Sequence, residues 1–304
     1  MSADSRHVER CVETAMDCGV DAAMALTVAL AAGAPASVRE GRELLEKLAP
    51  ALSALEAREP KLRTRLAELE PELRLDREIA KIRADLGDHE IRGRLVFRDL
   101  VGKRSFFQVA ALAIGGVELS ASDAELLEHL GVNTQLADAR IWPLTVVRRV
   151  AARRGMAYGV LAGTAVALNP NMGAQPVGGF MRALDRLEAG LARGRTVASQ
   201  LEEAFARRER IPGVGRPVLG PDERNAQVAA LAHAHGRDEG PSWKLASEVD
   251  AIFAAKKKQR VNSAGLQGAI MRDMGFSPAA ASAFCLLYFF TQILAQAVAA
   301  EEHL

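Results

Sequence analysis

The strongest restriction on the fold of this chain lies near its C-terminal end, where Met274 to Ala300 carry no formally charged side chain. About 20 apolar residues are enough for a helix to cross a bilayer, so this run is either a membrane span or the centre of a large helical core. Two glutamines, Gln292 and Gln296, are costly in lipid, and Ser277 followed by Pro278 is a typical N-cap and first turn. We therefore expect a buried core helix, with a dimer contact as a further role open to it, and no membrane partner.

Length and composition agree with a helical globular protein. The chain has 304 residues, which corresponds to roughly two domains at about 150 residues each. Apolar residues make up 49% of it and charged residues 25%, which excludes a wholly disordered chain. Aromatic residues are only 5%, so helix formers outweigh strand formers. With 39 basic and 38 acidic side chains, the net charge of +1 gives no electrostatic reason to expect nucleic acid as the main partner.

The cysteines and the N-terminus indicate a cytoplasmic protein. Cys11, Cys18 and Cys285 are an odd number without CxxC spacing, which is typical of free thiols in a reducing compartment rather than of disulfides or a zinc site. We therefore expect no metal. Acidic side chains such as Asp4 and Glu9 precede the first apolar run, whereas a secretory signal begins with a basic leader.

The chain changes texture near residue 89. Residues 1–88 are Leu-rich with alternating charges and several prolines, which predicts a helical packing or dimerisation segment without chemistry of its own. Beyond it, Ser122 and Glu125 have the spacing of a capping box. A rigid loop spans residues 211–217, and two final helices end the chain. The other helices are expected at 142–153, 157–168, 177–190, 195–209, 222–236 and 241–256.

Four stretches, in order, resemble motifs of the citrate synthase superfamily, which includes citryl-CoA lyase modules. Together they cover about two thirds of the chain. The resemblance implies an all-α fold with a large domain (about 89–180 and 257–304), a small domain (about 181–256), an active site between them and a homodimer. The stretches are Arg92-Gly93 to Lys103 with Ser105-Phe106 and Gly116 to Leu119; Thr145 to Ala152; Ile211 to Val218 with Asp222-Glu223-Arg224; and Arg260-Val261-Asn262 with Gly268 and Gly275-Phe276.

The family's catalytic positions are altered here. The family uses an aspartate to take a proton from the acyl-CoA, two histidines to polarise oxygens, and arginines to hold carboxylates. At the matching positions this chain has Ala264 for the aspartate and Met172 and Arg216 for the histidines. Losing a positioned base costs about 10²–10⁴ in rate and losing an oxyanion donor about 10²–10³. We therefore predict that the chain does not carry out ordinary citrate synthesis.

Several residues remain suitable for binding a carboxylate. Arg224 matches a carboxylate-binding arginine of the family, if one gap is allowed. Arg216 is a permanent cation that can polarise a carbonyl or clamp a carboxylate, and an internal salt bridge is an equal alternative. Asn171 and Gln175 can donate hydrogen bonds near the expected thioester, although capping a turn is the commoner role for such side chains.

The expected coenzyme A contacts come from two further segments. Lys257 lies where the family brings a lysine to the CoA phosphates, and a plain solvated charge run is at least as good an interpretation of residues 256–260. The loop of Pro212, Gly213, Val214 and Gly215 keeps the family's turn. A coenzyme A thioester is therefore the expected substrate.

Two hypotheses of different classes stay open. In the first, the protein binds an acyl-CoA or a citrate-like carboxylate and carries out altered or weakened carbon–carbon bond chemistry, as a transferase or lyase of the citryl-CoA type. In the second, it is a pseudoenzyme that serves as a regulatory or assembly subunit, either as a homodimer or as a heteromer with an active relative.

Overall fold

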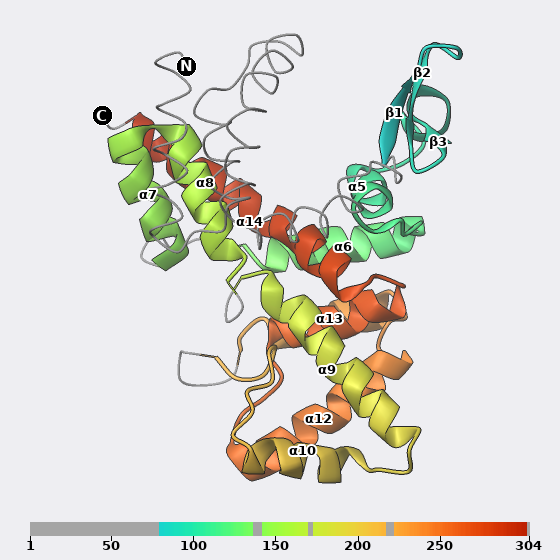
Figure 1. Cartoon of the computed structure of the whole chain (residues 1–304), viewed down its shortest axis with the longest axis vertical. Helices are drawn as coiled ribbons and strands as arrows, with labels where there is room; N and C mark the ends of the chain where they lie inside the picture. Colours follow the sequence, from blue (N-terminus) through green and yellow to red (C-terminus); the bar gives the residue numbers. More distant parts are fainter. Residues whose placement is uncertain (1–78, 136–141, 170–172, 217–221, 303–304) are drawn as a thin grey trace, which may run out of the picture. The chain divides into compact units, whose positions relative to one another are not determined.

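The computed structural model describes residues 79–135, 142–169, 173–216 and 222–302. The chain forms two units that meet between Glu78 and Ile79, and everything described here belongs to the second (Figure 1). The boundary expected near residue 88 falls inside this unit. The expected N-terminal helices, Asn171 and Met172 lie outside the described residues.

A small antiparallel sheet opens the described unit. Its order is β1-β2-β3, with Ala80 opposite Ile91 and Glu90 opposite Leu95. Between β2 and β3, Arg92 and Gly93 have φ angles of 48° and 82°, the left-handed pair that a tight two-residue hairpin favours. Sequence patterns missed the sheet because its strands are too short to show alternation. They are β1 (Ala80–Arg83), β2 (Asp88–Ile91) and β3 (Arg94–Leu95).

A short π-helical segment, η1 (Val96–Leu100), joins the sheet to α5 (Phe106–Gly115) and α6 (Ala121–Asn133). The capping box of this region is formed by Ser105 and Gln108 at the start of α5. The expectation of one at Ser122 was wrong, because α6 begins earlier and Ser120 is its N-cap. The Ser120 hydroxyl accepts from the backbone N–H of Asp123 at 3.0 Å, which satisfies one of the free donors of the first turn.

The remaining helices lie close to their predicted ranges, with two exceptions shortened by local backbone geometry. The helix expected at 195–209 ends at Ala206, because Arg208 is left-handed with φ of 55°. The helix expected from 222 starts only at Asn225, after a turn held by Asp222. The helices are α7 (Trp142–Arg154), α8 (Met156–Ala167), α9 (Gln175–Leu191), α10 (Val197–Ala206), α11 (Asn225–Ala234), α12 (Pro241–Lys257), α13 (Ser263–Asp273) and α14 (Pro278–Glu301).

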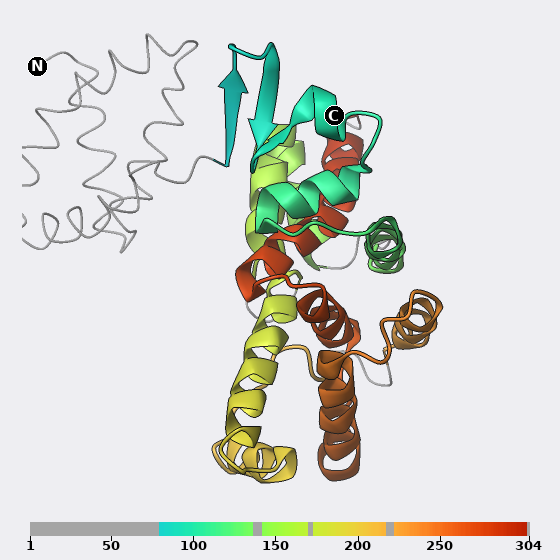
Figure 2. The same cartoon turned by 90° about the vertical axis from the view of Figure 1, so that its right-hand side faces the viewer.

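The uncharged C-terminal run forms α14, the central helix of this unit (Figure 2). Ser277 caps it, accepting from the N–H of Ala280 at 3.2 Å, and Pro278 occupies its first turn as predicted. By length and composition alone α14 could cross a membrane, but it packs against α5, α6, α7, α8, α9 and α13. Phe284 and Ile293 are fully buried in this packing. Of the most apolar 18-residue window of α14, 39% is buried in this packing.

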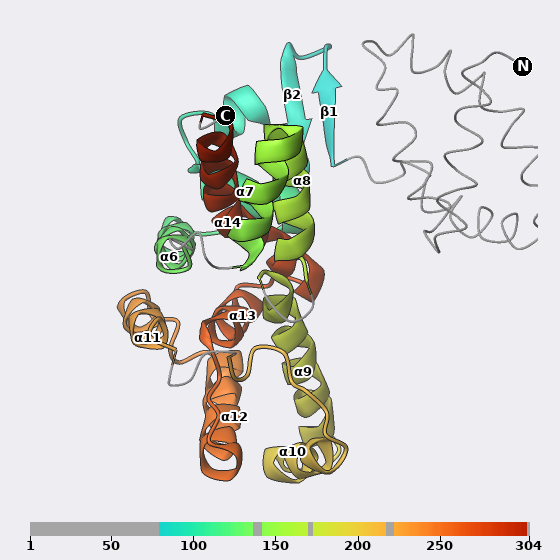
Figure 3. The same cartoon turned by 90° about the vertical axis from the view of Figure 1, so that its left-hand side faces the viewer.

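Two hydrophobic cores share α9 and α13. The first core contains residues of α5, α6, α7, α8, α11 and α14, together with residues of the N-terminal part of α9. The second core joins α10 and α12 to the later turns of α9, from Phe180 to Leu187. Figure 3 shows α9 and α12 side by side, with α10 across their ends. Because Ile270 of α13 belongs to the first core and Ala269 to the second, α13 connects the two.

Candidate functional site

The glycine-bearing loop after α10 is held against two helices by close backbone contacts. Gly213 has a φ of 80°, and a Cβ added there would lie 2.8 Å from the Phe180 Cβ and 2.9 Å from the Gly265 Cα. Only glycine fits this combination of left-handed backbone and close approach. The loop is thereby fixed between α9 and the first turn of α13.

A residue at the start of α13 completes the attachment of the loop. The Asn262 side chain accepts from the N–H groups of Ala264 and Gly265 at 3.0 and 3.2 Å, which makes it the N-cap of α13. The same side chain donates to the Gly215 carbonyl at 2.7 Å, and the Asn262 N–H donates to the Gly213 carbonyl at 2.9 Å. Loop and helix start therefore form one rigid piece.

Asp222 is the centre of the polar network beside this helix start. Its side chain is 2% exposed. Arg224 donates to both carboxylate oxygens, from Nε at 2.8 Å and from Nη2 at 2.9 Å. The backbone N–H of Ser263, in the first turn of α13, donates to Oδ2 at 3.0 Å. The Asp222 carboxylate thus joins the loop before α11 to the start of α13.

The electrostatics of Asp222 make it a weak base. Burial opposes its charged form, but the hydrogen bonds from the Arg224 side chain and the Ser263 backbone outweigh burial and hold the pKa of Asp222 below its ordinary value. A carboxylate with a lowered pKa and its lone pairs engaged is a poor acceptor for a substrate proton.

Arg216 forms an ion pair with another residue of the same chain. Its Nη1 donates to the carboxylate of Glu223 and lies 3.9 Å from Oδ1 of Asp222. The Glu223 carboxylate raises the pKa of the Arg216 guanidinium and is in turn held at a lowered pKa. The internal salt bridge, one of the two interpretations of Arg216, is therefore present. With Arg224 and Asp222 added, two cations face two carboxylates, and the cluster is electrically balanced.

The position matched to the family's proton-removing aspartate carries no acid. Ala264 lies half-buried in the first turn of α13. The carboxylate nearest along the network is Asp222, which bonds the N–H of the preceding residue, Ser263. Sequence reasoning did not single out Asp222. Its Asp-x-Arg spacing with Arg224 was the signal that could have identified it.

The other predicted site residues do not join this cluster through any contact described. The ammonium of Lys257 lies 4.7 Å from the ring centroid of Phe205 on α10. Gln175 is half-buried in the first turn of α9 and has no hydrogen bond to the cluster's described residues. In the loop, the N–H of Val214 donates to the Ile211 carbonyl, so it is already engaged.

The backbone donors of the loop limit how it can hold a phosphate. The Gly215 N–H donates to the Arg260 carbonyl at 2.8 Å, and Val214 forms an isolated bridge with Val261. Pro212 has no N–H and packs against Gly179. The coenzyme contacts expected of Pro212 to Gly215 therefore stay a prediction, in which the N–H groups of Val214 and Gly215 take no part.

Comparison with known proteins identifies the fold. No protein family model matches the chain, and no curated protein does. Citryl-CoA lyase from Hydrogenobacter thermophilus is 22% identical, with a TM-score of 0.63 over 73% of this chain and 85% of the lyase. ATP citrate lyase from Methanosaeta concilii, solved with (3S)-citryl-CoA, is 18% identical with a TM-score of 0.61.

A second ATP citrate lyase, from Methanothrix soehngenii and solved with citrate and coenzyme A, is 18% identical with a TM-score of 0.59. The match covers 74% of this chain but only 38% of each ATP citrate lyase. The chain therefore corresponds to well under half the length of those enzymes. Its described part has the fold of citryl-CoA lyase, the citrate synthase fold.

Proposed function

We propose that this protein binds a citrate-like carboxylate, or an acyl-CoA related to it, beside the first turn of α13. The observation that carries the proposal is that the Arg224 side chain is held in one orientation and is still partly exposed. Asp222 holds its Nε and Nη2 atoms, which fixes the guanidinium plane, while the side chain stays 32% exposed. Arginine has five N–H donors, so the outer edge of Arg224 can accept a second carboxylate in a fixed geometry.

The carbon–carbon bond chemistry at this site is altered or weakened. Ala264 cannot move a proton, and the lowered pKa of Asp222 makes that carboxylate an inefficient replacement. A general base contributes about 10²–10⁴ in rate, so proton removal from an acyl-CoA methyl group is slow without one. Cleavage of the carbon–carbon bond of a citryl-CoA, as transferase or lyase chemistry in the reverse direction, releases an enolate that must take up a proton, so it is weakened at this site for the same reason.

A second function is favoured by Arg216 alone. The Arg216 guanidinium is bound to the Glu223 carboxylate, so it is not available to polarise the keto group of a substrate. If Arg216 only stabilises the fold and binds no ligand, the protein is a pseudoenzyme that acts as a regulatory or assembly subunit. The two functions differ in whether a ligand binds at Arg224.

Calorimetry on the full chain separates these functions. Citrate, oxaloacetate, acetyl-CoA and coenzyme A are titrated separately, with Arg224→Ala as the test variant and the 63% exposed Arg207→Ala as the matched control. Saturable binding that Arg224→Ala weakens about tenfold or more, and Arg207→Ala leaves unchanged, supports the binding function. Absence of binding by all four compounds leaves the pseudoenzyme.

The proposed partner is a second copy of this chain, in the cytoplasm. Helix α8 contains no charged residue, and its Tyr158 and Leu161 are 60% and 66% exposed. Leu294 and Val298 of α14, which packs against α8, are 41% and 40% exposed. In a two-fold dimer the same patch meets itself, which an uncharged apolar strip allows without repulsion. We define Tyr158, Leu161, Leu294 and Val298 as the α8–α14 strip.

A further inference from the structure

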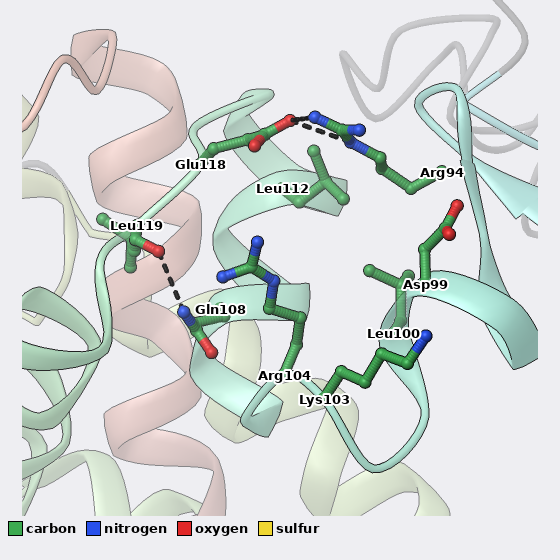
Figure 4. Close-up of a pocket in the computed structure, with 9 residues that line it drawn as sticks. All are labelled: Arg94, Asp99, Leu100, Lys103, Arg104, Gln108, Leu112, Glu118 and Leu119. Carbon is green, nitrogen blue, oxygen red and sulfur yellow. Dashed lines mark hydrogen bonds and ion pairs between the residues drawn. The ribbon is translucent and has the colours of Figure 1, made fainter.

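A pocket of about 230 Å³ lies between the sheet region and α5, apart from the Asp222 cluster (Figure 4). Pockets for drug-sized ligands run from about 300 to 1,000 Å³, so this one suits a small molecule. Neither the predicted site residues nor the proposed function uses it. It is lined by Arg94, Asp99, Leu100, Lys103, Arg104, Gln108, Leu112, Glu118 and Leu119.

The floor of the pocket is apolar and fixed in place. Leu100, Leu112 and Leu119 are each no more than 6% exposed. The buried Gln108 amide donates to the Leu119 carbonyl at 2.9 Å, and its oxygen accepts from the Ser105 N–H at 3.0 Å. The pocket therefore does not depend on a ligand to form its apolar surface.

Both carboxylates at the rim are already engaged. Glu118 accepts from Nε of Arg94 at 3.0 Å and from Nη2 at 2.5 Å. Asp99 accepts from the Leu95 N–H at 2.8 Å. The Lys103 ammonium donates to the Arg98 carbonyl, which neutralises none of its charge. These contacts leave the acids of the pocket satisfied and its cations in excess.

Of the three cations in the lining, Arg94 is paired with Glu118, whereas Lys103 and Arg104 have no carboxylate partner among the described residues. Arg104 is the one of these two that can hold a carboxylate by two parallel hydrogen bonds. Its backbone N–H donates to the Leu100 carbonyl at 2.9 Å, and Figure 4 shows its side chain extending toward Gln108 and Leu112. Among the residues described, no carboxylate pairs with it. The lining contains three cations (Arg94, Lys103 and Arg104) and two carboxylates, so the pocket carries one positive charge in excess.

We infer that this pocket binds a small monocarboxylic acid whose short apolar chain lies on the leucine floor. The Arg104 guanidinium matches the plane of a carboxylate and holds it by two parallel hydrogen bonds. A single negative charge balances the pocket. A phosphate dianion or citrate would bring surplus negative charge close to Asp99 and Glu118, which disfavours both.

The test is calorimetry of hexanoate binding to the full chain at low ionic strength. The wild-type protein is expected to bind hexanoate saturably, and hexanamide, phosphate and citrate are expected not to displace it. Arg104→Gln is expected to weaken binding by about 10- to 100-fold, since a charge-assisted hydrogen bond is lost. Binding of hexanoate is also expected to weaken as the salt concentration is raised, because the Arg104 guanidinium is exposed and its charge is screened.

Two control variants assign the binding to this pocket. Arg98→Gln removes an exposed arginine of the same segment that does not line the pocket, and Arg224→Ala removes the arginine of the Asp222 cluster. Both are expected to bind hexanoate as the wild type does. The inference is overturned if no saturable binding is found, if Arg104→Gln binds normally, or if hexanamide or citrate competes. Loss of binding in Arg224→Ala alone would place hexanoate at the proposed functional site and also overturn it.

Discussion

At the scale of single residues, the candidate site depends on a carboxylate that sequence reasoning passed over. Arg224 was predicted from its motif, and the structure places it beside the start of α13. Asp222 could not be ranked above other acids, because its role comes from Ser263, which lies 41 positions away in the chain. The sequence also could not decide between the two interpretations of Arg216, because the choice depends on the three-dimensional contact between Arg216 and Glu223.

The Asp222 carboxylate gives the fold a pH-dependent contribution. Its pKa is lowered on folding from the ordinary value of 3.8, so its stabilisation is complete above that value and is lost as pH falls through the folded pKa. Asp222→Asn is expected to lower the free energy of unfolding by about 1.5–3 kcal/mol at pH 7, and by much less at the acid end. Urea denaturation from pH 7 to pH 3 measures this. The exposed Glu128→Gln should match the wild type throughout, and a constant Asp222→Asn difference down to pH 3 would contradict the assignment.

The loop glycine provides a second test at this scale. Gly213→Ala meets both a left-handed backbone and a close approach, whereas Gly194→Ala has a φ of 77° with nothing within 4 Å. We expect about 1 kcal/mol of destabilisation for Gly194→Ala and about 1–3 kcal/mol more for Gly213→Ala, from overpacking. Thermal and urea denaturation of the pair give the difference. Equal losses would show that the contacts with Phe180 and Gly265 yield without cost.

At the scale of elements, most of the helices were predictable and the short strands were not. Helix α14 was recognised because its uncharged run and Ser277-Pro278 start are local signals. The sheet was missed because strands of four, four and two residues carry almost no periodicity. The start of α6 was misplaced because Ser120 and Ser122 are both suitable caps, and packing decides between them.

Two neighbouring residues of α14 differ in how deeply their side chains are buried. Ile293 is 1% exposed in the first core, whereas Leu294 is 41% exposed. Ile293→Ala is expected to lower the free energy of unfolding by about 2–5 kcal/mol, because it removes buried methyl groups and leaves a cavity. Measured in the Leu161→Glu background, in which the proposed dimer contact is removed, Leu294→Ala is expected to cost under 1 kcal/mol. Chemical denaturation of both variants checks this, and a reversed order would mean that the opposite face of α14 is the packed one.

At the scale of the whole molecule, the α8–α14 strip is the surface through which we expect two copies to associate. Leu161→Glu is expected to convert the protein to a monomer, because it places a charge opposite its own copy across the two-fold axis. Val132→Glu on α6 changes a side chain of nearly equal exposure, 68% against 66%, outside the strip. Light scattering after size-exclusion chromatography gives the masses. A monomeric wild type, or a dimeric Leu161→Glu, would refute the proposed interface.

The two cores are expected to unfold together, because α9 and α13 contribute to both. Leu201 of α10 is 1% exposed in the second core, so Leu201→Ala should destabilise it by about 2–5 kcal/mol. Hydrogen exchange followed by mass spectrometry is expected to show the same loss of protection in peptides of α10 and of α14. Loss confined to α10 would show that the cores open independently.

Helix α9 crosses α13 and α14 at two glycines, Gly178 and Gly268, and these positions are useful for recognising distant relatives of this protein. A Cβ on Gly178 would lie 2.1 Å from the Pro278 carbonyl oxygen, and one on Gly268 would lie 2.8 Å from that of Val177. Main chain touches main chain at both points, so neither position tolerates a side chain, whatever reaction the protein performs. We therefore expect proteins with this helix crossing to keep glycine at the positions of Gly178 and Gly268, even where their reacting groups differ.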